Sequence, residues 1–397
     1  MFLEFFIWGA WFVTLGTFLG TNLKASGAET AAVFSTQSWG AIIAPFIIGL
    51  IADRYFNAER ILGVLHLVGA FLMYQMYQSI DLSSFYIYVF SYMVLYMPTL
   101  ALVNSVAFNQ MKDPEKEFSS IRVWGTIGWI VAGLSISYVF HWDSVESLAS
   151  GMLKNTFLLA GIAALVLGLL SFTLPATPPK VSDEKIKIGD IIGLDALKLL
   201  KDKNFAVFFI SSILICIPLA FYYQNANPFL TESGLENPTG KMAIGQISEA
   251  LFLLLIPVFF SKYGFKKTIL VGMVAWALRY ALFAYGNGGE LSFMLIIGIA
   301  LHGICYDFFF VSGQIYTNSK AGDKYKSAAQ GLITLATYGV GMLIGFAVAG
   351  WITDNYKTAT GTINWEMVWI IPAGIALAVF VLFALTFNDK NKTEVSH

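Results

Sequence analysis

Polar and ionisable side chains interrupt several long apolar stretches of this chain. In KMAIGQISEALFLLLIPVFFS, which runs from Lys241 to Ser261, Gln246 and Glu249 lie three residues apart and share one face of a helix. A carboxyl group in such a segment costs about 2.5–3.5 kcal/mol or more at the centre of a bilayer, and it normally faces a protein interior or a water-filled path. We therefore take Glu249 as the leading candidate for function.

The stretch LHGICYDFFFVSGQIY, which begins at Leu301, carries a second set of such residues. His302 and Tyr306 are four residues apart, and Asp307 follows on the same broad face of a helix. For His302, three roles stay open, since its imidazole could bind a ligand, titrate, or be a satisfied core group. The stretch therefore supplies polar groups that could face those of the Glu249 segment.

Arg279 lies in the middle of another apolar segment. An unpaired guanidinium there is very costly, so we expect it to pair with a carboxylate or with a cluster of carbonyl groups. Asp307 and Glu249 lie at comparable expected depths. If Arg279 holds Asp307, that aspartate is ionised and structural, and Glu249 is the group that titrates; the sequence leaves both arrangements open.

Two further segments carry polar groups at helical spacing. Arg122, Thr126 and Trp129 recur at i, i+4 and i+7 and share one helix face, although Arg122 could equally be an anchor at the membrane interface. In IPLAFYYQNANPFL, amide side chains stand between Pro218 and Pro228, and both prolines can interrupt a helix and free backbone groups. The amides in question are Gln224, Asn225 and Asn227.

The composition identifies the solvent in which these segments lie. Of the 397 residues, 57% are hydrophobic and only 12% are charged, against about 25% charged in soluble proteins, and the mean hydropathy is +0.68. A spanning helix needs about 20 mainly apolar residues. On that template the chain is an all-α integral membrane protein with twelve transmembrane helices. The expected spans are 1–20, 30–52, 60–79, 84–108, 119–141, 155–174, 205–230, 242–261, 268–286, 291–316, 327–352 and 365–387.

Positive charge alternates between the two sets of connections. Loops 53–60, 109–122, 175–204, 262–267 and 317–326, with the tail 388–397, hold nineteen of the 24 Lys and Arg residues. By the positive-inside rule, both termini and the long middle segment face the cytoplasm. The proline-led segment 175–204 divides six helices from six, which predicts an N-terminal half at 1–174, a cytoplasmic linker at 175–204 and a C-terminal half at 205–397. Repeats of this kind place a substrate site between halves near the midplane.

The loop after the second span resembles a superfamily signature. In GLIADRYFNAER, Asp53 stands beside Arg54 and Arg60, and this arrangement looks like the loop motif of the major facilitator superfamily. Charges at a helix end can pair in one conformation and separate in another. We therefore expect Asp53, Arg54 and Arg60 to act in conformational gating; the alternative is an ordinary solvated turn.

More specific matches extend over nearly the whole chain. WGAWFVTLGTFL, YMPTLALVN, IRVWGTIGW, GQISEALF, VAWALRYALFAYG and YDFFFVSG resemble bacterial nucleoside permeases of the nucleoside:proton symporter family. The resemblance implies proton-driven nucleoside uptake by alternating access, in the bacterial cytoplasmic (inner) membrane. It also implies that the substrate is held by residues on the fifth, seventh, eighth and tenth spans, with acidic residues on the last two.

Carried onto this chain, the resemblance assigns substrate contacts and proton-coupling groups. Glu249 and Asp307 occupy the acidic positions and are the expected proton carriers. The seventh span departs from the family pattern, because Ala220 and Tyr223 stand where the family has a glutamine and an asparagine, so the amides of the next turn are the expected replacements. The expected substrate-binding residues are Arg122, Thr126, Trp129, Tyr223, Gln224, Asn227, Gln246, Glu249, His302, Tyr306 and Asp307.

Other classes of function lack a sequence signal. The chain has no phosphate-binding loop, metal-ligand cluster or nucleophile elbow, so we expect no cofactor, no metal and no enzymatic activity. Its expected partners are nucleosides, protons and the lipid bilayer, with no nucleic acid, and we expect a monomer. The departure in the seventh span leaves one alternative, a proton symporter of the same fold for a sugar or another small polar solute.

Overall fold

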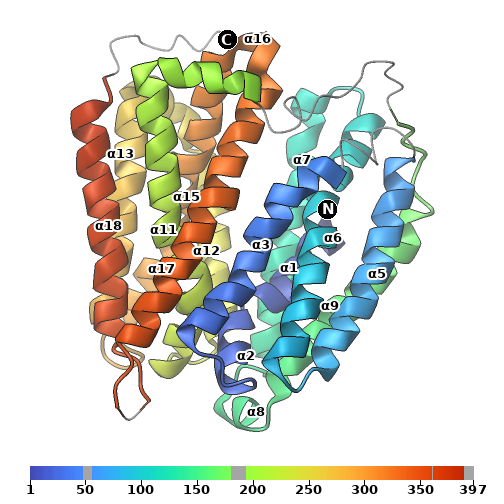
Figure 1. Ribbon diagram of the computed structural model, residues 1–397, viewed down its shortest axis with the longest axis vertical. Coiled ribbons are helices and arrows are strands. Elements are labelled where there is room, and N and C mark those ends of the chain that lie inside the picture. Colours follow the sequence, from blue (N-terminus) through green and yellow to red (C-terminus); the bar gives the residue numbers. More distant parts are fainter. Residues whose placement is uncertain (48–55, 180–193, 360, 389–397) are drawn as a thin grey trace. The chain divides into compact units, whose positions relative to one another are not determined.

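The computed structural model describes residues 1–47, 56–179, 194–359 and 361–388, and their regular structure is helical (Figure 1). The chain divides into two compact units. The first unit comprises Met1–Lys187 with Glu236–Ala243, and the second comprises Ile188–Leu235 with Ile244–His397. Each unit is described by itself below.

Helices of the first unit pack lengthwise around an aromatic core. α1 packs against α7 and α9, α3 against α6, and α5 against both α6 and α9. Phe18, Phe85 and Phe157 contact one another at its centre, with ring centroids 4.7–5.4 Å apart. The helices are α1 (Phe2–Phe12), α2 (Leu15–Thr21), α3 (Gly27–Ile47), α5 (Ala58–Gln78), α6 (Leu82–Gln110), α7 (Pro114–Leu134), the π-helical turn η2 (Ser135–Val139), α8 (Val145–Ala149), the short 3-10 turn η3 (Met152–Lys154) and α9 (Asn155–Ser171).

The second unit has a core of its own. α13 packs against α18, and α11 packs against α17 and α18. Trp369 of α18 stacks on Tyr280 of α13, with ring centroids 5.4 Å apart. The elements are η4 (Leu194–Lys201), α11 (Lys203–Glu232), α12 (Pro238–Leu253, whose first residues belong to the first unit), α13 (Ile256–Tyr285), α14 (Ser292–Ala300), α15 (His302–Tyr306), the π-helical turn η5 (Asp307–Val311), α16 (Ser312–Thr334), the π-helical turn η6 (Leu335–Gly341), α17 (Met342–Asn355) and α18 (Trp365–Thr386).

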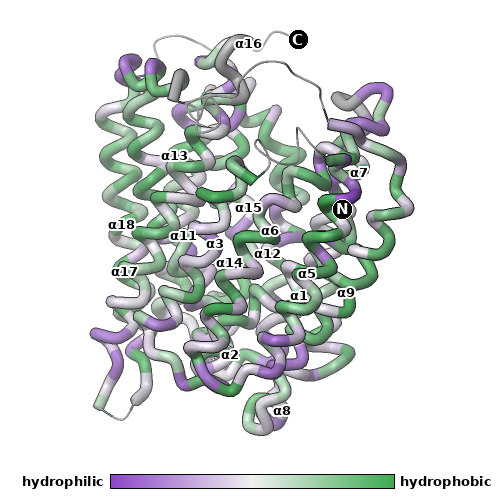
Figure 2. Tube along the Cα trace, turned by 45° about the vertical axis from the view of Figure 1, so that its right-hand side comes forward, coloured by the Kyte–Doolittle hydropathy of each residue, from purple (hydrophilic) through white to green (hydrophobic). Residues whose placement is uncertain are grey.

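Hydropathy marks these helices as membrane-spanning. In the described ranges, nine helices are long and apolar enough to cross a bilayer, and hydrophilic residues gather at helix ends and in connections (Figure 2). Three helices at expected spans, α3, α7 and α12, fall outside those nine. α12 is only 16 residues long, and α7 carries charged residues in its first two turns.

Two helix boundaries differ from the simple reading of hydropathy. The expected span 242–261 is interrupted, since α12 ends at Leu253 and α13 begins at Ile256. Pro257, at the start of α13, has no N–H to donate to the carbonyl four residues earlier, so it suits the first turn of a helix, where that hydrogen bond is absent anyway. α13 itself bends at Gly264, whose φ of 75° lies in the left-handed region that glycine tolerates.

α11 shows the opposite outcome. The helix runs unbroken from Lys203 to Glu232 through both Pro218 and Pro228. The hydroxyl of Tyr280 donates a hydrogen bond of 2.5 Å to the carbonyl of Pro218, so a neighbouring side chain bonds the backbone beside the first proline. The two cysteines, Cys216 and Cys305, are both free and fully buried.

Candidate functional site

Four elements of the second unit present the polar residues expected from the sequence. α12 carries Gln246 and Glu249, both half-buried, while α15 and η5 carry His302 and Asp307, both buried. α11 carries Tyr223, which is half-buried, together with the fully buried Gln224 and the buried Asn227. Tyr306 is half-buried between His302 and Asp307, at the junction of α15 and η5.

His302 connects Arg279 to Glu249. Nη1 of Arg279 lies 3.0 Å from Nδ1 of His302, and Nε2 of His302 lies 3.8 Å from Oε2 of Glu249. A guanidinium only donates hydrogen bonds, so Nδ1 must accept and the imidazole is neutral, with its proton on Nε2. That proton faces the Glu249 carboxyl, while Nδ1 bonds to Arg279, so the imidazole lies between the two side chains.

Aromatic rings complete the surroundings of Arg279. Its guanidinium carbon lies 3.6 Å from the ring centroid of Tyr222 and 5.7 Å from that of Phe283. The Tyr222 ring in turn stacks on His302, with centroids 5.2 Å apart. Within the described part of the chain, no carboxylate lies within ion-pair distance of Arg279. Of the partners left open by the sequence, neither Asp307 nor Glu249 is the direct one, since a neutral imidazole and an aromatic face take that place.

Asp307 is buried with unused hydrogen-bonding capacity. It is 1% exposed, and its Oδ2 has no hydrogen-bond partner among the described residues. Gln224 is similar, because both its amide nitrogen and its amide oxygen lack a partner in the described chain. Buried polar groups of this kind are rare in native proteins and call for a ligand, an ion or water as partner.

α12 and α15 approach each other closely beside Glu249. The N–H of Gly303 donates to Oγ of Ser248 at 3.2 Å, and the same hydroxyl donates to the carbonyl of Ala300. A Cβ on Gly303 would lie 2.5 Å from the Ser248 backbone and 2.6 Å from the amide nitrogen of Glu249. Only glycine permits this contact, which sets the position of Glu249 relative to α15.

π-helical turns lie at two points around the same cluster. η5 begins at Asp307, and η6 contains Tyr338, whose hydroxyl is hydrogen-bonded to that of Tyr306. Turns of this type are rare and occur frequently at functional sites. Among the described residues, no group of three or more His, Cys, Asp or Glu is suited to a metal ion.

α7 of the first unit carries Arg122, Thr126 and Trp129, all half-buried. The guanidinium carbon of Arg122 lies 4.3 Å from the ring centroid of Phe5, and the Trp129 ring meets that of Trp8 edge-on at 5.5 Å. Both contacts are with α1, which packs along α7. The two side chains are thus positioned by aromatic residues of the neighbouring helix.

The expected gating residues are described only in part. Asp53 and Arg54 lie outside the described residues. The side chain of Arg60 is 72% exposed, and its Nε lies 4.0 Å from Oε1 of Glu59. Glu59 is itself buried and accepts hydrogen bonds from the N–H of Thr177 and from Asn57. A carboxylate at the start of α5 therefore holds both Arg60 and the chain beyond α9.

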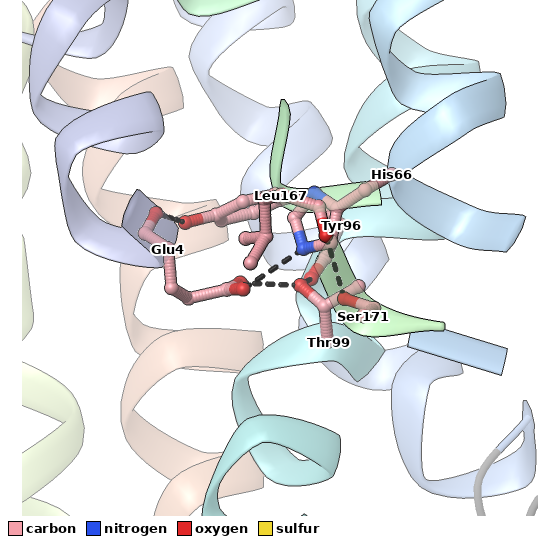
Figure 3. A network of polar contacts seen from close by, with 6 residues as sticks. All are labelled: Glu4, His66, Tyr96, Thr99, Leu167 and Ser171. Atoms are coloured by element: carbon pink, nitrogen blue, oxygen red, sulfur yellow. Dashed lines mark hydrogen bonds and ion pairs between the residues drawn. The ribbon is translucent and has the colours of Figure 1, made fainter. Parts of the chain in front are cut away.

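Sequence reasoning gave no role to a second buried carboxyl, Glu4 of α1. Its Oε2 lies 2.8 Å from Nε2 of His66, and its Oε1 accepts from Thr99 at 2.6 Å (Figure 3). The available signal was an acidic residue and a histidine, each alone in an apolar helix. Nothing in the spacing of residues from α1, α5 and α6 indicates that they meet, because their contact depends on tertiary packing.

Comparison with known proteins identifies the family. A family model described as nucleoside H+ symporter matches residues 1–392. The chain belongs to the nucleoside H+ symporter family. The putative nucleoside transporter YegT of Escherichia coli (strain K12) is 42% identical to it over 400 residues, which cover 98% of this chain and 93% of YegT. The nucleoside permease NupG of the same strain is 32% identical over 406 residues, covering 98% and 94%.

The fold of this symporter family member agrees with that of a solved structure. The crystal structure of the nucleoside transporter NupG matches with a TM-score of 0.86 at 31% identity, and the match covers 98% of this chain and 97% of that one. The all-α membrane transporter fold predicted from the sequence is confirmed, as is the resemblance to nucleoside permeases. The relatives are transporters and permeases, so this symporter family member is a membrane transporter and no enzyme.

Proposed function

We propose that this chain takes up nucleosides together with protons by alternating access, as a monomer in the lipid bilayer of a bacterial cytoplasmic (inner) membrane. Membership of the nucleoside H+ symporter family supports the reaction. The observation that carries the proton step is Asp307, a buried carboxyl whose Oδ2 has no hydrogen-bond partner in the described chain. The distribution of lysine and arginine supports cytoplasmic termini.

The proposed proton step uses two carboxyl groups of the second unit, Glu249 and Asp307. Two carboxylates that interact strongly away from water repel each other, so a proton bound to one of them stabilises the pair. The titration then belongs to the pair and not to either residue alone. In the proposed cycle, the Glu249 and Asp307 pair gains a proton from outside, the substrate binds, the transporter changes conformation, and both are released inside. The proton drives uptake only because its binding changes substrate affinity or the conformational equilibrium.

The proposal assigns substrate contacts to both halves of the chain. From the second half, the amides of Gln224, Asn227 and Gln246 offer donors and acceptors to ribose hydroxyls or to a base edge, and Tyr223, His302 and Tyr306 offer aromatic faces. From the first half, Trp129 would stack on a base, and Arg122 and Thr126 would hydrogen-bond to the ligand. The halves would comprise 1–174 and 205–397, joined by a cytoplasmic linker at 175–204, with Asp53, Arg54 and Arg60 forming a charge network that opens and closes.

The test of coupling is nucleoside accumulation in proteoliposomes with an imposed pH gradient. We expect a labelled nucleoside to accumulate when the outside is acidic, and to equilibrate without accumulation when a protonophore collapses the gradient. Accumulation that is unchanged by the protonophore would contradict proton symport. In counterflow, labelled substrate exchanges for unlabelled substrate without a pH gradient. It therefore measures substrate binding and conformational change without proton coupling.

Variants of the two carboxyls assign the proton. We expect Glu249→Gln and Asp307→Asn each to abolish gradient-driven accumulation, because the pair then has one titratable member. The variant of the true proton carrier should keep counterflow activity, since the neutral amide mimics its protonated form. Glu29→Gln, which changes an exposed carboxyl at the start of α3, is the matched control and should accumulate nucleoside as the natural chain does. Full accumulation by Glu249→Gln would remove Glu249 from the mechanism.

The substrate class is tested by thermal unfolding of the purified protein with nucleosides, bases and sugars. A ligand that binds only the folded state stabilises it by about 2.7 kcal/mol at a concentration of one hundred times its Kd. We expect nucleosides to raise the melting temperature and sugars to leave it unchanged. A sugar that alone raises it would favour the alternative function, a sugar symporter of the same fold.

A further inference from the structure

The Glu4 carboxyl is fully buried in the first unit, far in sequence from the carboxyls of α12 and η5. It is 0% exposed, and its two oxygens contact different helices, with Oε2 at His66 of α5 and Oε1 at Thr99 of α6 (Figure 3). The hydroxyl of Tyr96 donates to the backbone carbonyl of Glu4 at 2.7 Å and so fixes the helix beside the carboxyl. The site is therefore built from three helices.

The charged groups around Glu4 are few. Glu4 acts electrostatically on Tyr92 and Tyr96, and His66 is its direct partner, while Arg122 lies over the neighbouring Phe5 ring. α9 packs against α1 but contains no ionisable residue. The ionisable groups that face Glu4 are thus His66 of α5, Tyr92 and Tyr96 of α6, Arg122 of α7 and the amino group of Met1 on its own helix.

Thr99 has one proton and two acceptors. Its hydroxyl lies 2.6 Å from Oε1 of Glu4 and 2.6 Å from the carbonyl oxygen of Tyr96. A hydroxyl carries a single hydrogen, so it donates to only one of the two at a time. When Glu4 is ionised, Thr99 can donate to the carboxylate. When Oε1 carries a proton, the carboxyl donates it to Oγ1 of Thr99, and Thr99 donates to the carbonyl oxygen of Tyr96. Both contacts of Thr99 are then hydrogen bonds.

His66 fits both states as well. At 2.8 Å one hydrogen must lie between its Nε2 and Oε2 of Glu4. A neutral imidazole with its proton on Nε2 donates to this oxygen whether or not the other oxygen is protonated. With His66 neutral, an ionised Glu4 leaves a net negative charge on the buried pair, and a bound proton neutralises it. The network accordingly accepts a proton at Oε1 without losing a hydrogen bond.

We propose that the Glu4–His66 pair, with Thr99, is a proton-binding site of the first unit, separate from Glu249 and Asp307. In the binding step a proton from water bonds to Oε1 of the Glu4 carboxylate, the carboxyl becomes neutral, and the Thr99 hydroxyl turns from Glu4 to the Tyr96 carbonyl. Release reverses these changes and breaks no other bond. The binding of the proton is independent of the proposed symport function, whereas its influence on transport rests on it.

Infrared difference spectroscopy tests the binding directly. Protonation of a carboxylate produces a carboxyl C=O band between alkaline and acidic pH, and we expect Glu4→Gln to remove one component of that band. Glu29→Gln changes an exposed carboxyl of the same unit and should leave this component in place. Thr99→Val keeps the Glu4 carboxyl but removes its hydrogen-bonding hydroxyl, so the component should persist and shift in frequency. A spectrum of Glu4→Gln that equals the natural one would overturn the proposal.

The pH dependence of counterflow tests whether the site affects transport. We expect Glu4→Gln and His66→Gln to shift the pH profile in the same direction, and the double variant to add no further shift, because the two residues form one site. Counterflow activity and thermal unfolding confirm that each variant is folded. If Glu4→Gln does not fold, Thr99→Val still reports on the Glu4 carboxyl. If neither the pH profile of counterflow nor the infrared band changes in these variants, the Glu4–His66 contact is structural only.

The two proposals fail separately. If the natural chain shows no gradient-driven accumulation, proton symport fails, but the infrared component removed by Glu4→Gln still decides the Glu4–His66 site. If Glu4→Gln leaves the infrared band intact while the natural chain accumulates nucleoside with protons, symport stands and this site is refuted.

Discussion

Among individual residues, His302 has the most constrained chemistry. Its Nδ1 accepts from Arg279, its Nε2 faces Glu249, and its ring stacks on Tyr222. Because the guanidinium cannot accept a hydrogen bond, a second proton on His302 would place two donors against each other. His302 is therefore a neutral group that lies between the Arg279 guanidinium and the Glu249 carboxyl.

This role predicts how substitutions at His302 affect stability. His302→Leu removes the acceptor for Arg279 and should lower the free energy of unfolding by about 1.5–3 kcal/mol, the contribution of a hydrogen bond to a charged group. His302→Asn offers an oxygen near the position of Nδ1 and should recover most of that loss. The measurement is the apparent melting temperature in detergent. Equal melting temperatures for the two variants would show that the Arg279 contact does not stabilise the fold.

The partners of Arg279 also show what spacing can and cannot predict. An arginine in an apolar helix needs a partner, and the sequence left open a carboxylate, such as Asp307 or Glu249, or a cluster of carbonyl groups. The structure uses an imidazole and the face of Tyr222 instead. Charge and burial predict that a partner exists, whereas its identity depends on which residues of α11, α13 and α15 meet in space.

Among the helices, α12 has one close local contact beside Glu249. Gly303 of α15 contacts the backbone of Ser248 and the amide of Glu249, and Ser248 bonds to both Ala300 and Gly303. α12 is too short to count among the nine apolar helices of the described chain, and its contact with α15 at Ser248 and Gly303 fixes the backbone next to Glu249.

Gly303→Ala tests this packing. The added methyl group would lie 2.5 Å from backbone atoms of Ser248, and overpacking of this kind typically costs about 1–3 kcal/mol. We expect a lower melting temperature and a loss of transport, since Glu249 moves with the backbone of α12. Gly374→Ala on α18 is the control, because a Cβ there has no atom within 4 Å, and it should leave both measurements unchanged. Natural activity in Gly303→Ala would mean that α12 can shift freely.

Helix existence was predictable from the sequence, whereas helix continuity was not. Apolar length predicted spans at 205–230 and 365–387, and the helices α11 (Lys203–Glu232) and α18 (Trp365–Thr386) lie there. The two prolines of α11 did not interrupt it, while Pro257 stands at a break between α12 and α13. Proline removes one backbone hydrogen bond in each case, so tertiary packing, and not proline alone, decides whether the helix continues.

For the whole molecule, the orientation in the membrane is the property most directly open to experiment. Positive charge predicts cytoplasmic termini. The native thiols of Cys216 and Cys305 are fully buried, so a membrane-impermeant maleimide should not react with the natural chain. Cysteines introduced at exposed positions can therefore be read individually.

We expect Lys357→Cys, in the exposed connection before α18, to be labelled in intact cells. Lys112→Cys, exposed between α6 and α7, should be labelled only after the membrane is permeabilised. The natural chain is the control for background labelling. The reverse pattern would mean that the termini lie outside, and it would leave the family assignment untouched, since that rests on the whole sequence.

The π-helical turn η5 has a consequence for the register of the chain. Such a turn holds one residue more than an α-helical turn, and each residue of a helix adds about 100° of rotation. Beyond η5, Tyr316 stacks on Phe265 with centroids 4.1 Å apart, and Gly313 lies against Phe208. Deleting Phe309 would restore a regular α-helix. The residues on one side of the deletion would then rotate, so either Asp307 or the contacts of Gly313 and Tyr316 would leave their present faces. The number of residues in this span is therefore as much a determinant of the site as their identity.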